Sequence, residues 1–383
     1  MNLSGRVGHA GVLGRASAEP NPQEQRASPG QVRRDAMGPA RRAVTSTRGP
    51  TFPRRTLSSC GKPSAYAIYL VVTVAHPLLG PAVRAQVERA ASAHLGCPWA
   101  VRGFTSLDDR ASHPCGILHG APFSVFAKLG PSASAREEFT AELTGLRLIG
   151  QAAGVRVPVP VADGVASTEA GELLLYEALT ERAPGARERA DWRSIGQVLA
   201  ALHQIGHERF GLGGPRGFFG PLPQDNRPVP ANRWAAFFAE RRLLPLLRTA
   251  ADSGHLPPAL AAGVEQIAAR LPALAGPEPR PSLLHGDAQQ NNFVSTAAGA
   301  VVIDAAPYFG HPEADLALVG YFQPVPGDVL AAYQEILPVD PGFAGRRELW
   351  RLPAYLAVIA VAGGTSVGQT YLDRLAAAIK RYR

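Results

Sequence analysis

The sequence contains little cysteine and no hydrophobic segment long enough to cross a membrane. Its three cysteines, Cys60, Cys97 and Cys115, are widely spaced and include no C-x-x-C pair. An odd and scattered set of this kind excludes a disulfide framework and is typical of a reducing compartment. The apolar stretch at 65–75 faintly resembles an export signal, but it lies well inside the chain and is too short to span a bilayer. We therefore expect a cytoplasmic protein with no membrane partner.

Excess charge is also absent beyond the first 62 residues. The formal net charge is +8, and residues 1–62 hold ten arginines and one lysine against three acidic residues, so the 28 basic and 28 acidic residues that follow cancel. A neutral folded region argues against a nucleic-acid partner. Because residues 1–62 are also poor in large apolar side chains, they are predicted to form a disordered basic tail. The tail is either an anion-binding arm or, the interpretation we favour, the product of an upstream start codon.

The rest of the chain has the composition of a globular protein with a sizeable core. Of its 383 residues, 46% are apolar and 18% are charged. The spacing of the apolar residues predicts three strands with two turns between 99 and 129, and a further strand at 172–176. It predicts helices at 82–95, from Asp191 (a candidate N-cap residue) onward, at 232–249, at 258–275, and as a pair between 342 and the C-terminus.

Most of the candidate chemistry lies between residues 283 and 318. Asp287, in the sequence His-Gly-Asp, is followed by Asn292 five residues later, and Asp304 ends a short apolar run. An Asp, an Asn and a second Asp at adjacent strand ends are the arrangement that ATP-dependent phosphoryl transfer uses. Asp287 would orient the attacking hydroxyl, while Asn292 and Asp304 would hold Mg²⁺ against the phosphates. Alone, the His-Gly-Asp is equally well explained by a capped turn, but the combination indicates a small-molecule kinase.

Residues upstream complete a candidate ATP site. Lys128 ends an alternating strand and Glu142 lies on the helix that follows, so an ion pair between them would aim the ammonium at the phosphates. Glu177 and Leu179 fall where the hinge between two lobes is expected, and they are predicted to contact adenine. The stretch 106–116 has no run of glycines, but its turn-forming residues can present backbone N–H groups to phosphates. A solvated lysine and a plain hairpin loop are the alternative interpretations.

These patterns resemble two nested families. The Asp, Asn and second Asp are shared by protein-kinase-like phosphotransferases, which include aminoglycoside phosphotransferases and choline kinases. The run DAAPYFGHPEAD at 304–315, the GFFG motif at 217–220 and the N-R-W…R-R-L-x-P run at 232–245 resemble the fructosamine/ketosamine kinase family. The resemblance extends over roughly residues 96–380.

The resemblance implies an α+β, bilobal protein-kinase-like fold, with a small mixed β N-lobe and a larger, mainly helical C-lobe. ATP would bind in the cleft between the lobes. The predicted divisions of the chain are the disordered basic tail at 1–62, an N-terminal extension with a short helix at 63–98, the N-lobe at 99–178, and the helical C-lobe with the catalytic loop at 179–383.

The resemblance also implies roles for residues that follow Asp304. Tyr308, His311, Glu313 and Asp315 are candidates for contacting the acceptor substrate. Alternatively, Glu313 belongs to the first turn of a helix and Asp315 braces the catalytic loop. His285 is expected to hold that loop by hydrogen bonds to the backbone.

The catalytic loop departs from the family pattern H-G-D-L-W-x-G-N. Ala288 and Gln289 stand where the family has Leu-Trp, and Asn291 replaces the glycine. Because asparagine tolerates a left-handed backbone, the loop is expected to keep its shape. The absent tryptophan removes an aromatic wall beside the acceptor, so the phosphotransferase chemistry carries over better than the sugar-amine substrate.

Three hypotheses for function remain. The first is a kinase that phosphorylates a sugar hydroxyl of a fructosamine- or ribulosamine-type ketosamine, on a small glycated amine or on a glycated protein lysine. The second is the same chemistry on another small molecule, such as an aminoglycoside, an amino alcohol or a sugar. The third is a nucleotide-binding pseudokinase, against which we weigh the retention of Lys128, Asp287, Asn292 and Asp304.

Overall fold

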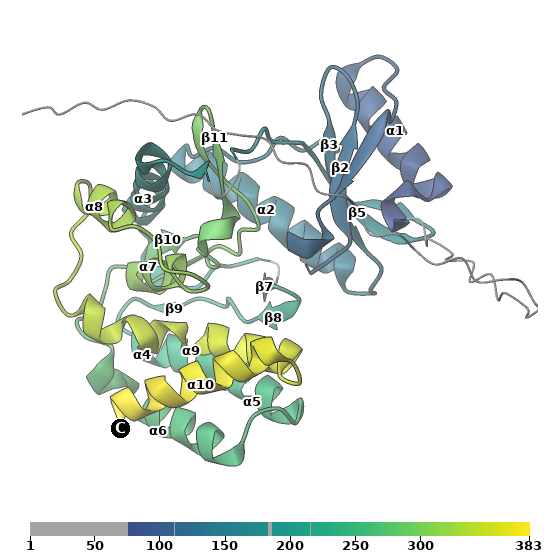
Figure 1. Ribbon diagram of the computed structural model, residues 1–383. Helices are drawn as coiled ribbons and strands as arrows, with labels where there is room; N and C mark the ends of the chain where they lie inside the picture. The colour runs from purple at the N-terminus through teal and green to yellow at the C-terminus, as the bar shows by residue number, and fades with distance from the viewer. Residues whose placement is uncertain (1–75, 111, 183–185, 215) are drawn as a thin grey trace, which may run out of the picture. The chain divides into compact units, whose positions relative to one another are not determined.

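The computed structural model describes residues 76–110, 112–182, 186–214 and 216–383 (Figure 1). The predicted disordered tail lies outside these residues, as does the apolar stretch at 65–75. The described residues confirm the expected α+β arrangement, with a small lobe built on one sheet and a larger lobe that is mainly helical.

The small lobe contains a five-stranded sheet in the order β1-β2-β3-β5-β4, and each neighbouring pair is antiparallel. The first three strands follow one another directly, as predicted for residues 99–129. In the register of β3 and β5, Lys128 lies opposite Leu174. The strands are β1 (Gly103–Ser106), β2 (Cys115–His119), β3 (Val125–Gly130), β4 (Ala166–Thr168) and β5 (Gly171–Glu177).

One face of this sheet packs against helix α1 (Pro81–Leu95), which Figure 1 shows beside the strands. Successive side chains of a strand point to opposite faces, and Val125 and Leu129 of β3 share a buried cluster with Val83 and Val87 of α1. The predicted helix at 82–95 is therefore present, but it does not form a separate extension. It supplies part of the core of the small lobe, because the sheet would otherwise expose this apolar face.

The opposite face of the sheet packs against α2 (Ala135–Ala153). Leu174 and Tyr176 of β5 share a buried cluster with Phe139 and Leu143 of α2. The apolar residues of α2 recur at three- and four-residue intervals, which gives the helix one buried side. Lys128 lies on this face of the sheet, opposite Leu174, and this placement brings its side chain toward α2.

The described residues of the large lobe form helices and four short antiparallel strand pairs. Helix α3 begins with a reciprocal capping box in which Glu188 is the N-cap and Asp191 is the third helical residue. The prediction that Asp191 is the cap was therefore wrong by three positions. The helices are α3 (Arg189–Gln204), α6 (Pro258–Leu274), α7 (Pro312–Val319), α8 (Asp328–Gln334), α9 (Phe343–Ala362) and α10 (Ser366–Tyr382); the strands are β6 (Arg209–Phe210) with β9 (Val229–Pro230), β7 (Gly217–Phe219) with β8 (Leu222–Gln224), β10 (Ser282–Leu284) with β13 (Tyr308–Gly310), and β11 (Phe293–Thr296) with β12 (Gly299–Val302).

The helix predicted at 232–249 is interrupted. It consists of α4 (Trp234–Phe238), one π-helical turn (Ala239–Leu243) and α5 (Leu244–Asp252). A π-helical turn inserts an extra residue and rotates the side chains that follow, and such turns are frequent at functional sites. This one carries Arg241 and Arg242, the two arginines of the R-R-L-x-P run.

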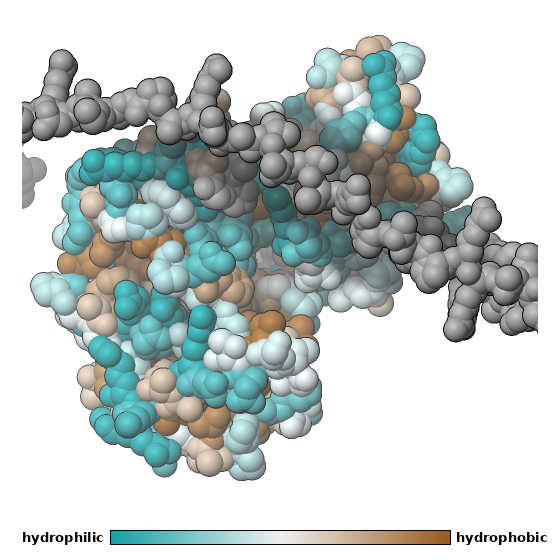
Figure 2. Space-filling view, in the orientation of Figure 1, coloured by the Kyte–Doolittle hydropathy of each residue, from teal (hydrophilic) through white to brown (hydrophobic). Residues whose placement is uncertain are grey.

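The predicted pair of C-terminal helices is confirmed by α9 and α10, which lie side by side in Figure 1. On the face of the molecule drawn in Figure 2, hydrophobic residues of the large lobe are interspersed with hydrophilic ones. Among the helices of the described ranges, none combines the length and the hydropathy needed to cross a membrane.

Candidate functional site

The backbone brings Asp287, Asn292 and Asp304 together around one hairpin. Asp287 and Asn292 lie on the loop between β10 and β11, and β11 pairs with β12 so that Phe293 lies opposite Val302. The N–H of Ile303 donates to the carbonyl of Asn292 at 3.0 Å. This bond places the residue before Asp304 directly against the loop that carries the other two side chains.

Side-chain hydrogen bonds fix the orientation of the two loop residues. The amide of Asn292 donates to the carboxylate of Asp287 at 3.1 Å and to the backbone carbonyl of the same residue at 2.9 Å. Because the Asn292 nitrogen is used in these bonds, its amide oxygen is directed away from Asp287. Asn291 lies within a 3-10 turn, Gln290–Asn292, and does not adopt the left-handed backbone considered for it.

Asp304 is held in a strained backbone conformation. Its φ is 50°, and it is the one non-glycine residue of the described ranges with a positive φ. A left-handed backbone is unfavourable for most side chains and persists where the surroundings impose it, which is common at functional sites. In this conformation the Asp304 carboxylate contacts Lys128 of the small lobe.

Lys128 bridges two carboxylates. Its ammonium donates to Glu142 of α2 at 2.8 Å and to Asp304 at 2.6 Å. The predicted Lys128–Glu142 ion pair is therefore present. Burial alone would lower the pKa of Lys128, but Asp304 and Glu142 outweigh burial and raise it. Lys128 accordingly stays charged and lowers the pKa of the Asp304 carboxyl, against the opposing effect of burial.

The carboxyl of Asp287 lies in a different environment. Burial raises its pKa from 3.8 to about 7, while hydrogen bonds from Gln289 and Asn292 act in the opposite direction and Asp304 adds to the rise. The amide of Gln289 donates to the Asp287 carboxylate at 3.2 Å. Gln289 stands where the family pattern has tryptophan, so the loop of this chain has an amide donor at that position. A carboxyl with a pKa near neutrality is suited to accept a proton from a hydroxyl.

Asp315 of α7 holds the backbone of the catalytic loop through hydrogen bonds. The Asp315 carboxylate accepts hydrogen bonds from the backbone N–H of His285 at 2.6 Å and of Gly286 at 3.1 Å, and its oxygen lies 3.2 Å from Nε2 of His203. His285 is fully buried and accepts from the N–H of Asp287 at 3.2 Å. Burial lowers the pKa of His285, which favours the uncharged ring that this bond to Nδ1 requires.

Gly286 is required by the shape of this loop. Its φ is 85°, and an added Cβ would lie 1.9 Å from the carbonyl oxygen of Ala306. Both the backbone angle and the contact exclude larger residues. The His-Gly-Asp sequence therefore combines a buried acceptor, a glycine in close contact with Ala306, and the carboxylate.

The residues predicted on the acceptor side have different surroundings. His311 is the N-cap of α7, with Nδ1 accepting from the N–H of Glu313. The Glu313 carboxylate is 3% exposed and accepts from Arg346 at 2.6 and 2.9 Å and from the indole of Trp350 at 2.8 Å. Glu313 lies in the first turn of α7 and Asp315 is bonded to the catalytic loop, which agrees with the alternative interpretation of each residue. Tyr308 and Asp315 are the members of the set that line a cavity.

The predicted hinge and phosphate-covering loop lie at the edge of the small lobe. The N–H of Glu177 donates to the backbone carbonyl of Val159. The Glu177 carboxylate lies 2.8 Å from Nε2 of His94. The N–H of Leu179, two residues later, has no acceptor among the described residues. The described residues of the predicted phosphate-covering stretch, 106–110 and 112–116, run from the last residue of β1 to the first residues of β2. Asp108 accepts from the N–H of Cys115 at 2.8 Å.

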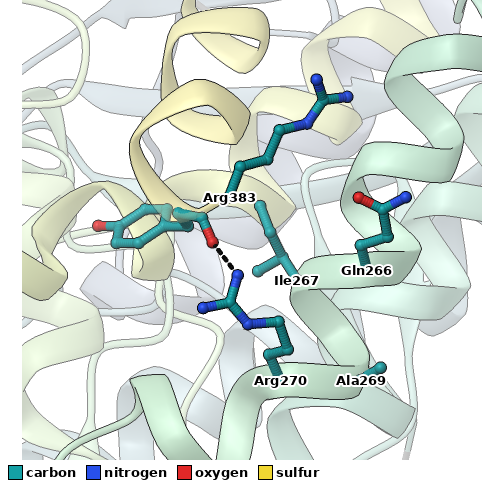
Figure 3. Close-up of a pocket in the computed structure, with 6 residues that line it drawn as sticks. Gln266, Ile267, Ala269, Arg270 and Arg383 are labelled. Atoms are coloured by element: carbon teal, nitrogen blue, oxygen red, sulfur yellow. Dashed lines mark hydrogen bonds between the residues drawn. The ribbon is translucent and has the colours of Figure 1, made fainter.

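A small cavity of about 30 Å³ lies beside the catalytic loop. It is bounded by Gly286 and Asp315, by Tyr308, and by two residues that sequence reasoning did not single out, Gln224 of β8 and Arg242 of the π-helical turn. Arg242 belongs to the R-R-L-x-P motif, but a motif does not indicate which of its residues line a cavity. Gln224 follows the GFFG motif by four residues and belongs to no motif noted in the sequence. A second depression lies between α6 and α10, where Arg270 donates to the carbonyl of Tyr382 at 2.6 Å (Figure 3), and it contains no residue of the candidate site.

The kinase-like arrangement of the site agrees with the proteins to which the sequence is similar. A family profile described as fructosamine kinase matches residues 83–381. The chain belongs to the fructosamine kinase family. Among curated proteins, it is 31% identical over 281 residues to a probable ketoamine kinase of Synechocystis, covering 72% of this chain and 90% of that protein. It is 29% identical over 257 residues to a ketosamine-3-kinase of Mus musculus, covering 61% of this chain and 81% of that protein.

Solved structures establish the fold. A crystal structure of a Thermobifida fusca protein assigned as a fructosamine-3-kinase aligns with a TM-score of 0.64 at 32% identity, covering 78% of this chain and 98% of that one. An aminoglycoside phosphotransferase, crystallised with ADP and hygromycin B, aligns with a TM-score of 0.53 at 16% identity, covering 77% and 98%. The fold is thus the protein-kinase-like, two-lobed fold that the resemblance implied, and this member of the fructosamine kinase family is a phosphotransferase.

The donor set suits a magnesium ion. Mg²⁺ prefers oxygen ligands and is usually held in kinases by one or two protein groups together with substrate phosphates. The amide oxygen of Asn292 and the Asp304 carboxylate, whose side chain is 40% exposed, are oxygens of this type. No cluster of three or more His, Cys, Asp or Glu side chains suited to a metal occurs in the described part of the chain. The two oxygens of Asn292 and Asp304 fit an ion that takes its other ligands from a bound nucleotide and water.

Proposed function

We propose that this protein transfers the γ-phosphoryl group of ATP, in the presence of Mg²⁺, to a sugar hydroxyl of a ketosamine of the fructosamine or ribulosamine type. The observation that carries the proposal is the chain of contacts from Glu142 through Lys128 to Asp304, beside Asn292 and Asp287. Membership of the fructosamine kinase family supports the sugar-amine substrate. The ADP complex of the aminoglycoside phosphotransferase supports the nucleotide.

In this proposal the small lobe holds the nucleotide. Lys128 steadies the phosphates, and Glu142 fixes the position of its ammonium. Backbone groups of Glu177 and Leu179 contact adenine, for which the N–H of Leu179 is the available donor. Bound Mg²⁺, held by Asn292 and Asp304, supplies charge neutralisation at the phosphates. Asp304 pairs with Lys128 at 2.6 Å, so the residue that would hold the ion contacts the residue that would steady the phosphates.

Asp287 acts on the acceptor. The substrate hydroxyl donates to its carboxylate, and the hydroxyl oxygen attacks the γ-phosphorus. A phosphorus–oxygen bond forms to the acceptor as the bond to the β-phosphate oxygen breaks, ADP departs, and the proton passes to Asp287. Gln289 and Asn292 keep the carboxylate in place through the two hydrogen bonds that they donate to it.

The site residues constrain the identity of the acceptor substrate less than they constrain the phosphoryl-transfer reaction. Ala288 is fully buried, and Gln289 is turned toward Asp287, so the loop presents no aromatic wall at this point. Ketosamines, as small glycated amines or as glycated protein lysines, are the substrates that family membership favours. Aminoglycosides, amino alcohols and free sugars are the alternative acceptors, and an inactive nucleotide-binding protein is the alternative from another class. A cytoplasmic location and the absence of a nucleic-acid partner stay predictions.

The experiment is a coupled ADP-release assay on the full chain. It compares fructosyl-lysine and ribulosyl-lysine with a panel of aminoglycosides, amino alcohols and sugars, with Mg·ATP and again with EDTA. Turnover of the ketosamines that stops with EDTA is the expected result. Turnover of another acceptor alone would overturn the substrate assignment and keep the chemistry. Binding of ATP without any turnover would favour the inactive nucleotide-binding protein.

A further inference from the structure

Two residues that line the small cavity beside the catalytic loop each have a buried polar atom without a hydrogen-bond partner. Gln224 is 7% exposed and Arg242 is 3% exposed, and both line the cavity. Neither the side-chain oxygen of Gln224 nor Nε of Arg242 forms a hydrogen bond within the described residues. Buried polar atoms are nearly always bonded, and each one left unpaired is unfavourable. An unpaired acceptor and an unpaired donor in one cavity indicate a ligand that can serve both.

Arg242 is held rigidly in place. Its terminal nitrogens donate to the carbonyl oxygens of Asp225 at 2.9 Å and of Arg241 at 2.9 Å, and to the side-chain oxygen of Asn226 at 2.5 Å. Its guanidinium lies over the ring of Tyr308, 4.0 Å from the centroid. These contacts use the end of the guanidinium and leave Nε as the free donor. The nearby carboxylate of Asp225 pairs with Arg241 instead, and Arg242 has no salt bridge in the described ranges.

The chemistry of the cavity favours a neutral hydroxyl over an anion. An anionic group would gain from Arg242, but it would face the acceptor oxygen of Gln224 and the carboxylate of Asp315, which lines the same cavity. A hydroxyl accepts from Arg242 Nε–H and donates to Gln224 at the same time. The volume of about 30 Å³ is the space of a hydroxyl or a water molecule and is too small for a sugar ring.

We propose that this cavity receives one hydroxyl of the acceptor sugar, with Gln224 and Arg242 as specificity-determining residues. The inference rests on the proposed function and adds to it the group by which the sugar is recognised. The cavity borders Gly286, the neighbour of Asp287, so a sugar anchored there has its other hydroxyls beside the catalytic carboxylate. Such a site discriminates strongly against an analogue that lacks the hydroxyl, because Gln224 and Arg242 are then left unpaired.

The test measures hydroxyl discrimination. Wild-type protein and Gln224→Leu are assayed with fructosyl-lysine and with analogues in which each sugar hydroxyl is replaced in turn by hydrogen. For the wild type, one analogue other than that lacking the phosphorylated hydroxyl should show a kcat/KM about 10–100-fold below that of the parent. In Gln224→Leu the parent should fall by about the same factor, so that the ratio between parent and analogue approaches one.

Arg242→Lys provides a second variant, because it keeps the charge and removes the Nε–H. It should reduce the same ratio, and the exposed residues Gln334 and Arg248 provide the matched controls Gln334→Leu and Arg248→Lys, which should leave the ratio unchanged. Circular dichroism establishes that each variant is folded. A wild-type ratio that persists in folded Gln224→Leu would overturn this inference and leave the proposed function intact. Absence of any wild-type turnover of ketosamines would overturn both.

Discussion

Replacing Asp287 by asparagine should lower the turnover number by several orders of magnitude and at the same time stabilise the protein. The pKa of this carboxyl is about 7 in the folded protein, against an ordinary value of 3.8. Because burial disfavours the charged form, the ionised Asp287 carboxylate lowers the free energy of unfolding. Asparagine is neutral at every pH and has nearly the same shape, and its side-chain oxygen can still accept from Gln289 and Asn292.

The size of the effect follows from the pKa difference. One pKa unit corresponds to about 1.4 kcal/mol, so a difference of roughly three units sets an upper limit of about 4 kcal/mol. Asp287 is only partly buried, and we therefore expect a gain of about 1–3 kcal/mol in the free energy of unfolding. Between about pH 4 and 7 the Asp287 carboxyl is still protonated in the folded protein but already ionised in the unfolded chain. The free energy of unfolding of the wild type therefore falls as the pH rises through this window. The gain should grow across this window and level off above it.

The assay is urea unfolding of the wild type and of Asp287→Asn, followed by circular dichroism at several pH values between 4.5 and 8.5 without nucleotide. The exposed residue Asp252 supplies the control Asp252→Asn, which should show no pH-dependent gain. Asp287→Asn should also lower kcat by about 10²–10⁴-fold while the dissociation constant of ATP changes little. A gain that is equal at pH 4.5 and 8.5, or full activity in the variant, would refute the reasoning.

Three further changes test the surrounding contacts. Lys128→Met removes a charged hydrogen-bond donor to two carboxylates, and kcat/KM for ATP should fall by about 10–100-fold, as steady-state kinetics at varied ATP would reveal. Gln289→Ala removes a bond that lowers the pKa of Asp287, so the acidic limb of the kcat/KM profile should move up by about half a unit to one unit; an unmoved limb would exclude Asp287 as the titrating group. Asp315→Asn leaves part of the loop N–H groups without an acceptor and should lower the free energy of unfolding by about 2–4 kcal/mol, and unchanged stability in urea would show that the bracing bonds are unimportant.

Much of the fold could be predicted from sequence because its signals are local. The two-residue period of β3 and the helical spacing in α2 depend on residues that are neighbours in the chain, and both elements lie where they were expected. The exceptions arise from longer-range effects. The break in the helix at 232–249 depends on a π-helical turn that the apolar spacing does not reveal. The placement of α1 in the core of the small lobe depends on a sheet face that only the folded strands create.

The sequence by itself determined the chemistry of this protein: the order and spacing of Lys128, Asp287, Asn292 and Asp304 indicated a kinase, and the motifs after Asp304 indicated its family. Tertiary structure alone decided how the remaining polar residues are used. Glu313 is enclosed by Arg346 and Trp350, whereas Arg242, 45 residues before Asp287 in the chain, lines the cavity beside the catalytic loop. The physical reason is that a side chain's hydrogen-bond partners come from segments distant in the sequence, and no local pattern records which of its atoms remain unpaired.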